Sequence, residues 1–186
     1  EAYTSKLKKN PMSDMMAKEA LRLLTPNIKT AVHNGSVKAA REAMLLGAMF
    51  AGQAFANSPV AAVHALAYPL GGHFHISHGL SNSLVLPHVM RFNLESSANL
   101  YAELAPLMFP EEVFVGTDQV ISAKLISLIE DLIAELELPR TLREMDIPES
   151  FLPALAKDAM LQTRLLINNS REVTIESVLE IYKAAY

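Results

Sequence analysis

The histidines of this chain are concentrated in one segment. Five of the six lie between His64 and His88, and the stretch from Ala43 to Met90 contains no Asp, Glu, Lys or Arg. Imidazole titrates near neutral pH and is the most common metal ligand in proteins. A charge-poor segment with this many imidazoles is therefore a candidate for a metal site or for a catalytic acid–base group.

His64 and His78 are the pair whose spacing matters most. They are fourteen positions apart, which on one continuous helix would separate them by about 21 Å along the axis, too far for one ion to bind both. Pro69 and Gly71-Gly72 lie between them. Because Pro removes a helix donor and paired Gly permits a reversal, the spacing predicts a helix, a turn and a new helix start, which could bring both imidazoles together as metal ligands. The alternative is that each is a hydrogen-bonded core residue.

The other histidines have simpler interpretations. His73 and His75 flank Phe74 in the predicted turn, and in an extended turn they would point to the same side, toward a substrate pocket or toward water. His88 follows a proline in an apolar run, which favours a structural role. His33 precedes Asn-Gly and is interpreted as a helix-end residue beside the C-terminal dipole.

Composition limits the classes of function. A net charge of −4 and the absence of a basic stripe argue against nucleic-acid binding. The chain has no cysteine, hence no disulfide or thiolate ligand, and we expect a cytoplasmic protein. Gln53, Asn57, Ser58 and Pro59 interrupt the uncharged stretch, so a buried helix is favoured over a membrane span. No secretory signal is visible, and a start at Glu1 without Met favours a piece of a longer chain.

Apolar residues recur at helical spacing through most of the chain, and this pattern predicts an all-α domain without repeats or linkers. Thr25-Pro26 in the first helix is either a kink or a fresh start. Ser36 is the expected cap of the second helix, and Thr117 or Asp118 that of the long helix in the second half. The predicted helices cover Leu21 to Val32, Val37 to Phe55, a segment around His64, Gly79 to Phe92 with a break or a bend near Pro87, Glu95 to Leu107, Ile121 to Leu132, Ser150 to Leu161 and Thr174 to Ala185, with a short capped turn from Thr141 to Glu144.

Several catalytic motifs are absent. The sequence has no G-x-G-x-x-G turn, P-loop, G-x-S-x-G elbow or H-E-x-x-H pair. It therefore shows neither a dinucleotide-binding turn nor a nucleophile elbow, and a zinc protease is disfavoured. Catalytic metal sites usually have at least three protein ligands, so two histidines make an incomplete set whose remaining members must come from elsewhere.

Residues 64 to 93 carry a recognisable pattern. The sequence reads HALAYPLGGHFHISHGLSNSLVLPHVMRFN, which resembles the signature of iron-containing (group III) alcohol dehydrogenases, including Pro69-Leu70-Gly71, His78-Gly79 and Leu86-Pro87-His88. Residues 1 to 5 and 168 to 186 are similar to the start and the end of the family's helical domain. The resemblance therefore covers essentially the whole chain.

The resemblance implies a fold and a metal site. Family members have an N-terminal α/β domain that binds the nicotinamide nucleotide and a C-terminal helical domain that holds a divalent metal. Residues 1 to 186 would then be one helical metal-binding domain of dehydroquinate synthase-like architecture, with the nucleotide-binding domain absent from this chain. The family's metal ligands are an Asp and three His. His64 and His78 match the last two, and the other two would precede Glu1.

The resemblance also implies cofactors and catalytic residues. Iron, Fe(2+), is the family's usual metal, zinc, Zn(2+), suits these ligand types equally well, and NAD or NADP would bind through the missing domain. Tyr68 stands where the family often has another histidine. A phenol exchanges hydrogen bonds but titrates far above neutral pH, so Tyr68 is either a weak proton relay or a packing residue. His75, or His73 in its place, is the second candidate catalytic residue.

The implied function is that of an oxidoreductase. The reaction would be a metal-dependent, NAD(P)-linked interconversion of an alcohol and an aldehyde or ketone, with this chain supplying part of the metal site. One alternative is a catalytically inactive helical assembly or interaction domain derived from the family. Another is a metal-dependent lyase on the same scaffold, as in dehydroquinate synthase. We expect a small-molecule alcohol or aldehyde as partner, no nucleic acid, no membrane, and a homo-oligomer.

Overall fold

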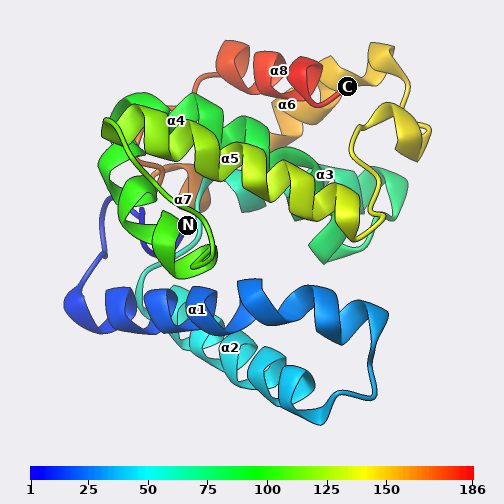
Figure 1. Ribbon diagram of the computed structural model, residues 1–186. Coiled ribbons are helices and arrows are strands. Elements are labelled where there is room, and N and C mark those ends of the chain that lie inside the picture. Colours follow the sequence, from blue (N-terminus) through cyan, green and yellow to red (C-terminus); the bar gives the residue numbers. More distant parts are fainter.

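The chain folds into helices only. The computed structural model describes all residues from Glu1 to Tyr186 and contains no β-strand, which confirms the predicted all-α class (Figure 1). The sequence pattern does not predict α7, which is a single helical turn. The elements are α1 (Pro11–His33), α2 (Lys38–Asn57), α3 (Ala62–Phe74), α4 (His78–Met108), α5 (Asp118–Glu135), the 3₁₀ turns η1 (Arg143–Met145) and η2 (Glu149–Phe151), α6 (Leu152–Met160), α7 (Thr163–Leu166) and α8 (Ile175–Ala184).

Helix α4 is the longest and connects most of the molecule, because α1, α3, α5 and α8 all pack against it (Figure 1). The sequence predicts two helices here, with a break between Phe92 and Glu95. The structure corrects this to one helix that passes through Pro87 and Pro106. The side chain of Asn93 is buried and pairs with Asn169, so it does not compete for the backbone hydrogen bonds of its own helix.

The largest core lies where α3, α4, α6 and α8 meet. Its centre contains Leu66 and Leu70 of α3, Leu84 of α4 and Leu155 of α6, all fully buried. Tyr182 of α8 is also fully buried, and its hydroxyl donates a hydrogen bond to the backbone oxygen of Leu66 at 2.7 Å. Burial of each such side chain contributes about 1.5–3 kcal/mol. The helix that carries the first candidate ligand is therefore fixed along its inner face.

The turn between α3 and α4 lies later in the chain than predicted. Helix α3 continues through Pro69 and Gly71-Gly72, and the chain reverses over residues 75 to 77. The predicted position of the turn is wrong because Pro69 is buried on the core side of α3 and both glycines adopt helical backbone. The predicted extended turn is also absent. His73 lies inside the helix, and His75 adopts the left-handed conformation with φ 55°.

Gly71 allows a close approach of the chain instead of forming the turn. The N–H of His75 donates to the Gly71 oxygen at 3.1 Å. A Cβ atom on Gly71 would lie only 3.3 Å from the backbone oxygen of Ile76. The missing side chain thus lets the returning chain pass close to α3. The prediction that the chain turns back between His64 and His78 is confirmed.

Helices α1 and α2 form a hairpin that contacts the other helices mainly through α1 (Figure 1). Pro26 lies inside α1, which excludes a fresh helix start there. The prediction that Ser36 caps α2 is wrong. Val37 occupies the cap position without a side-chain hydrogen bond, because Ser36 lies one residue too early and its hydroxyl donates to the Asn34 side chain at 2.6 Å.

Capping in the second half of the chain follows the prediction. Thr117 caps α5 by accepting a hydrogen bond from the Val120 N–H at 3.4 Å. Thr141 accepts one from the Glu144 N–H at 3.2 Å at the start of η1. Helices α6 and α8 are present and slightly shorter than predicted, with Thr174 as the cap of α8.

The uncharged stretch of residues 43 to 90 is divided among α2, α3 and α4, with short connections between them. None of the helices combines the length and the apolar character needed to cross a membrane.

Candidate functional site

Three rings meet beside the turn between α3 and α4. His64 and Tyr68 are four positions apart on one face of α3, and His78 is the first residue of α4. The ring centroids of His64 and His78 are 5.2 Å apart, and the Tyr68 centroid lies 6.4 Å from His64 and 6.1 Å from His78. We call these three residues the ring cluster. The structure therefore brings together three of the four residues that the sequence identifies as site candidates.

A buried carboxylate holds one of the imidazoles. The Oε2 atom of Glu1 is hydrogen-bonded to Nδ1 of His64, and Oε1 accepts the backbone N–H of Val63 at 2.6 Å. Burial alone would raise the pKa of the Glu1 carboxyl, but the hydrogen bond from His64, the charges of the terminal amine and of His64, and the Val63 N–H together hold it below its ordinary value. Glu1 is therefore an ionised acceptor of two hydrogen bonds.

This contact bears on which ring nitrogen of His64 carries the proton. An ionised carboxylate can only accept hydrogen bonds, so the proton of a neutral His64 ring must reside on Nδ1. The Nε2 atom then carries a free lone pair, which is the form of imidazole that binds a metal ion. We infer the proton position from the hydrogen-bond network.

The second imidazole has an amide neighbour. The Nδ2 group of Asn82, one turn after His78 in α4, donates to the backbone oxygen of His78 at 2.8 Å and lies 3.2 Å from its Nε2 atom. The Oδ1 atom of Asn82 is buried without a hydrogen-bond partner. Asn82 thus contacts the His78 ring, and its Oδ1 atom can still accept a hydrogen bond.

The ring cluster is open on one side. The His64 side chain is 24% exposed, Tyr68 is 37% exposed, and His78 is exposed. The carboxylate of Glu1 is more deeply buried than any of the three rings, at 12% exposure. The imidazoles are therefore fixed from inside the domain and accessible from outside.

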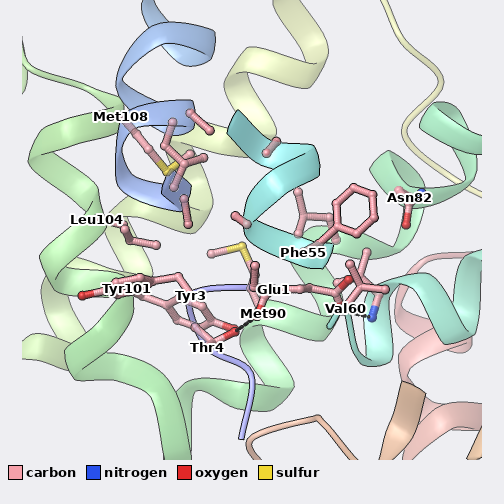
Figure 2. Close-up of a pocket in the computed structure, with 18 of the residues that line it drawn as sticks. Glu1, Tyr3, Thr4, Phe55, Val60, Asn82, Met90, Tyr101, Leu104 and Met108 are labelled. Atoms are coloured by element: carbon pink, nitrogen blue, oxygen red, sulfur yellow. Dashed lines mark hydrogen bonds between the residues drawn. The ribbon is translucent and has the colours of Figure 1, made fainter. Parts of the chain in front are cut away.

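An apolar cavity of about 350 Å³ adjoins His64 (Figure 2). It lies between the α1–α2 hairpin and helices α4 and α5, and most of the side chains around it are hydrophobic. The polar members of its wall include Glu1, His64 and Asn82. The apolar members include Phe55, Met90 and Leu104. Such a wall favours apolar groups over charged ones as occupants.

His73 and His75 lie outside the ring cluster. Nε2 of His73 is 2.5 Å from Oδ2 of Asp158, and its ring packs edge-on against Phe151 with centroids 5.2 Å apart. This pairing ties α3 to α6. His75 is exposed at the C-terminal cap of α3.

The two remaining histidines lie at other places in the fold. His33 is the last residue of α1, as predicted, and its Nε2 atom is 3.2 Å from the backbone oxygen of Glu135. His88 lines a second cavity together with Glu130 and Arg140. Burial lowers the pKa of His88, and the charge of Arg91 lowers it further.

Sequence reasoning does not identify Glu1 or Asn82 as part of the site. Asn82 could have been found, because it follows His78 by four positions just as Tyr68 follows His64. Glu1 has no such local signal, because it is 63 positions from its partner in the chain.

The chemistry of these donors fits part of a metal site. Two imidazoles suit iron or zinc, and the carboxylate behind one of them is the usual orienting partner of a metal-bound histidine. No group of three or more His, Cys, Asp or Glu side chains in the structure could hold a metal ion together. Fold and site thus define a helical domain in which two imidazoles lie side by side, one of them held by a buried carboxylate.

Comparison with known proteins identifies the family. The sequence model of the Fe-containing alcohol dehydrogenase family, C-terminal, matches residues 1 to 186. The chain is 40% identical over its full length to long-chain-alcohol dehydrogenase 1 of Geobacillus thermodenitrificans, of which it covers 47%. It is 35% identical to 1,3-propanediol dehydrogenase of Klebsiella pneumoniae, again with 47% of that protein covered.

Solved structures agree. The whole chain superimposes on 48% of a 1,3-propanediol oxidoreductase with a TM-score of 0.94 and 34% identity. It superimposes on 48% of an alcohol dehydrogenase from Oenococcus oeni with a TM-score of 0.91 and 28% identity. The chain belongs to the iron-containing alcohol dehydrogenase family and spans about half the length of these relatives, corresponding to their C-terminal part.

Proposed function

We propose that this chain is the helical domain of an oxidoreductase that interconverts an alcohol and an aldehyde or ketone with NAD or NADP. The observation that carries the proposal is the pairing of His64 and His78, with ring centroids 5.2 Å apart and Nδ1 of His64 hydrogen-bonded to Glu1, in a member of this family. Relatives named for long-chain alcohols, 1,3-propanediol and lactaldehyde support a small-molecule alcohol or aldehyde as the substrate.

His64 and His78 are the proposed metal ligands of this domain. Their remaining co-ligands would come from polypeptide outside these residues, since the structure contains no third ligand nearby. When bound, a divalent ion supplies a Lewis acid that polarises the substrate oxygen. Fe(2+) is the expected ion, and Zn(2+) is the alternative because it accepts the same ligand types.

Tyr68 and His75 are the proposed catalytic residues. The Tyr68 hydroxyl is carried on a ring beside both imidazoles, where it can exchange a hydrogen bond with a substrate oxygen. His75 is exposed three residues before His78, on the same turn. Its proposed role is to exchange protons with substrate or solvent from a position outside the ring cluster.

We expect nicotinamide binding and oligomerisation to be properties of the full-length protein. NAD or NADP would be held by the other half of the protein, because this chain has no dinucleotide-binding motif. The open side of the ring cluster is where that half would have to approach. A cytoplasmic location and a homo-oligomer are part of the same proposal, supported by the absence of cysteine and by exposed apolar side chains such as Leu45.

The test is metal binding and turnover by the full-length protein. Affinity for Fe(2+) and Zn(2+) and NAD(P)-linked oxidation of primary alcohols would be measured for the unchanged protein and for a His64→Ala, His78→Ala double variant. The expected result is that the double variant loses both metal binding and NAD(P)-linked alcohol oxidation. His33→Ala, which removes an exposed imidazole elsewhere, is the matched control and should retain both.

Two outcomes would contradict the proposal. An unchanged protein that binds no metal and turns over no nicotinamide would favour a catalytically inactive helical assembly domain. Metal binding without any nicotinamide-linked turnover would favour a lyase on the same scaffold.

A further inference from the structure

We propose that Glu1 is a positioning residue that selects the metal-binding tautomer of His64. This inference rests on the metal-ligand role proposed for His64 and adds a residue that neither the sequence motif nor the family match identifies. Glu1 does not itself contact metal or substrate in this proposal. It acts through the imidazole.

Both oxygens of the Glu1 carboxylate are engaged on α3. Oε2 is hydrogen-bonded to the His64 ring, and Oε1 accepts the N–H of Val63 at 2.6 Å. A carboxylate held at two points cannot rotate freely, so the direction of its hydrogen bond to His64 is fixed. The Glu1 side chain is also the least exposed member of the site, which shields this hydrogen bond from competing water.

The start of α3 explains why Glu1 is held there. The first N–H groups of a helix have no partner within the helix, and they attract negative charge. Ala61 at the N-cap position provides no side-chain hydrogen bond, and the first turn of α3 contains no acidic residue. Glu1 meets this need from a distant part of the chain by accepting the Val63 N–H. The same placement points its second oxygen at the next residue, His64.

The chemical consequence concerns the other ring nitrogen. With Nδ1–H directed to the carboxylate, the Nε2 lone pair of His64 is free on the side of the ring cluster. Outer-shell partners of this kind change metal affinity by about 10–100-fold.

The substitution Glu1→Gln separates this role from simple helix capping. The amide has nearly the same shape, and its oxygen can still accept the Val63 N–H. Its NH₂ group can only donate, so the His64 ring must accept at Nδ1 and carry its proton on Nε2, where the proton competes with the metal ion. A capping role predicts little effect of this change, whereas the positioning role predicts a change of tautomer.

Two measurements on the full-length protein test the inference. The first is the ¹⁵N NMR spectrum of histidine-labelled, metal-free protein, which distinguishes the Nδ1–H from the Nε2–H tautomer of His64 without any metal. The second is affinity for Fe(2+) and Zn(2+). We expect the Nδ1–H form in the unchanged protein, the Nε2–H form in Glu1→Gln, and a metal affinity about 10–100-fold weaker in the variant.

Control variants make the result specific. Glu103→Gln removes the same charge from a carboxylate that pairs with Tyr3 and Lys18, and it should change neither the tautomer nor the metal affinity. Glu1→Asp keeps the charge but shortens the side chain, so it cannot reach both donors as well. It should give an intermediate loss of metal affinity. Thermal unfolding of each variant shows whether the fold is retained.

The outcomes distinguish this inference from the proposed function. An unchanged tautomer in Glu1→Gln, or an unchanged metal affinity, would overturn the inference and leave Glu1 as a helix cap. If His64→Ala weakens metal binding and Glu1→Gln does not, this inference alone has failed. If His64→Ala leaves metal binding unchanged, the metal-ligand assignment has failed instead.

Discussion

The rings of His64 and His78 lie 5.2 Å apart between centroids, although fourteen positions separate the two residues in the chain. They come together because α3 ends and α4 begins between them, and Gly71 lets the returning chain pass close to α3.

The neighbouring glycines Gly71 and Gly72 provide a matched test of the turn. A Cβ on Gly72 would meet nothing within 4 Å, so Gly72→Ala should stabilise α3 by about 0.5–1 kcal/mol. A Cβ on Gly71 would press on the Ile76 oxygen, and relieving that contact costs about 1–3 kcal/mol. We therefore expect Gly71→Ala to be less stable than Gly72→Ala in urea unfolding, and only Gly71→Ala to weaken metal binding. Equal stability of the two variants would show that the turn can relax without cost.

Tyr68→Phe tests whether the hydroxyl of the ring cluster takes part in catalysis. The substitution keeps the ring and its packing against both imidazoles, so metal affinity should not change. It removes a group that can exchange a hydrogen bond with the substrate oxygen, so we expect kcat to fall by about 10²-fold, at the lower end of the range for general acid–base groups. The measurement is steady-state turnover by the full-length protein at saturating alcohol. An unchanged kcat would assign Tyr68 to packing.

The contact between Tyr182 and Leu66 should contribute measurably to stability. Tyr182→Phe removes one buried hydrogen bond to the Leu66 oxygen and should lower the free energy of unfolding by about 1 kcal/mol. Leu66→Ala leaves a cavity in the same core and should cost about 2–5 kcal/mol. Denaturant unfolding of this domain checks both values. If Leu66→Ala lowered the free energy of unfolding less than Tyr182→Phe, the core around α3 would have to collapse into the cavity left by the Leu66 side chain.

The amides of Asn93 and Asn169 form a reciprocal buried pair. Each Nδ2 group donates to the other side chain's Oδ1, at 3.0 and 2.8 Å. Asn169→Ala would leave the Asn93 amide buried without its partner, at a cost of about 1–3 kcal/mol. Asn99→Ala, at an exposed position of the same helix α4, should change stability by only a few tenths of a kcal/mol. Similar effects of the two variants in thermal unfolding would contradict a structural role for the pair.

His88 should make stability depend on pH. Burial, assisted by the positive charge of Arg91, lowers the pKa of His88 in the folded state below its ordinary value of 6.5, while Glu130 opposes the shift. The unfolded chain then binds the proton more readily than the folded one. The contribution to stability is full above pH 6.5 and is lost as the pH falls through 6.5 toward the folded-state pKa, at no more than about 1.4 kcal/mol per pH unit.

His88→Gln should remove this dependence. Urea unfolding of the unchanged protein and the variant between pH 5 and pH 8 would show the difference, with His33→Gln as the control for loss of an imidazole as such. If the free energy of unfolding changed with pH in the same way for the unchanged protein and for His88→Gln, His88 would have the same pKa in the folded and the unfolded state.

Much of the fold follows from local sequence. Helical spacing of apolar residues predicts the all-α class and most of the helices, and Thr117 and Thr174 act as helix caps in the structure. These features depend on contacts between residues three or four positions apart. The thirty-residue motif around His64 and His78 likewise predicts the two imidazoles as a pair.

Only the tertiary structure decides the rest. The motif does not show that Pro69 remains inside a helix, because that depends on burial against a distant core. The side chain of Asn93, in the middle of α4, finds its hydrogen-bond partner in Asn169, 76 positions away. The carboxylate of Glu1 reaches His64 across 63 positions, and nothing near either residue in the sequence indicates the contact. Sequence periodicity reports local backbone preferences, whereas the tautomer and orientation of a site residue are set by partners that only the folded chain brings into contact.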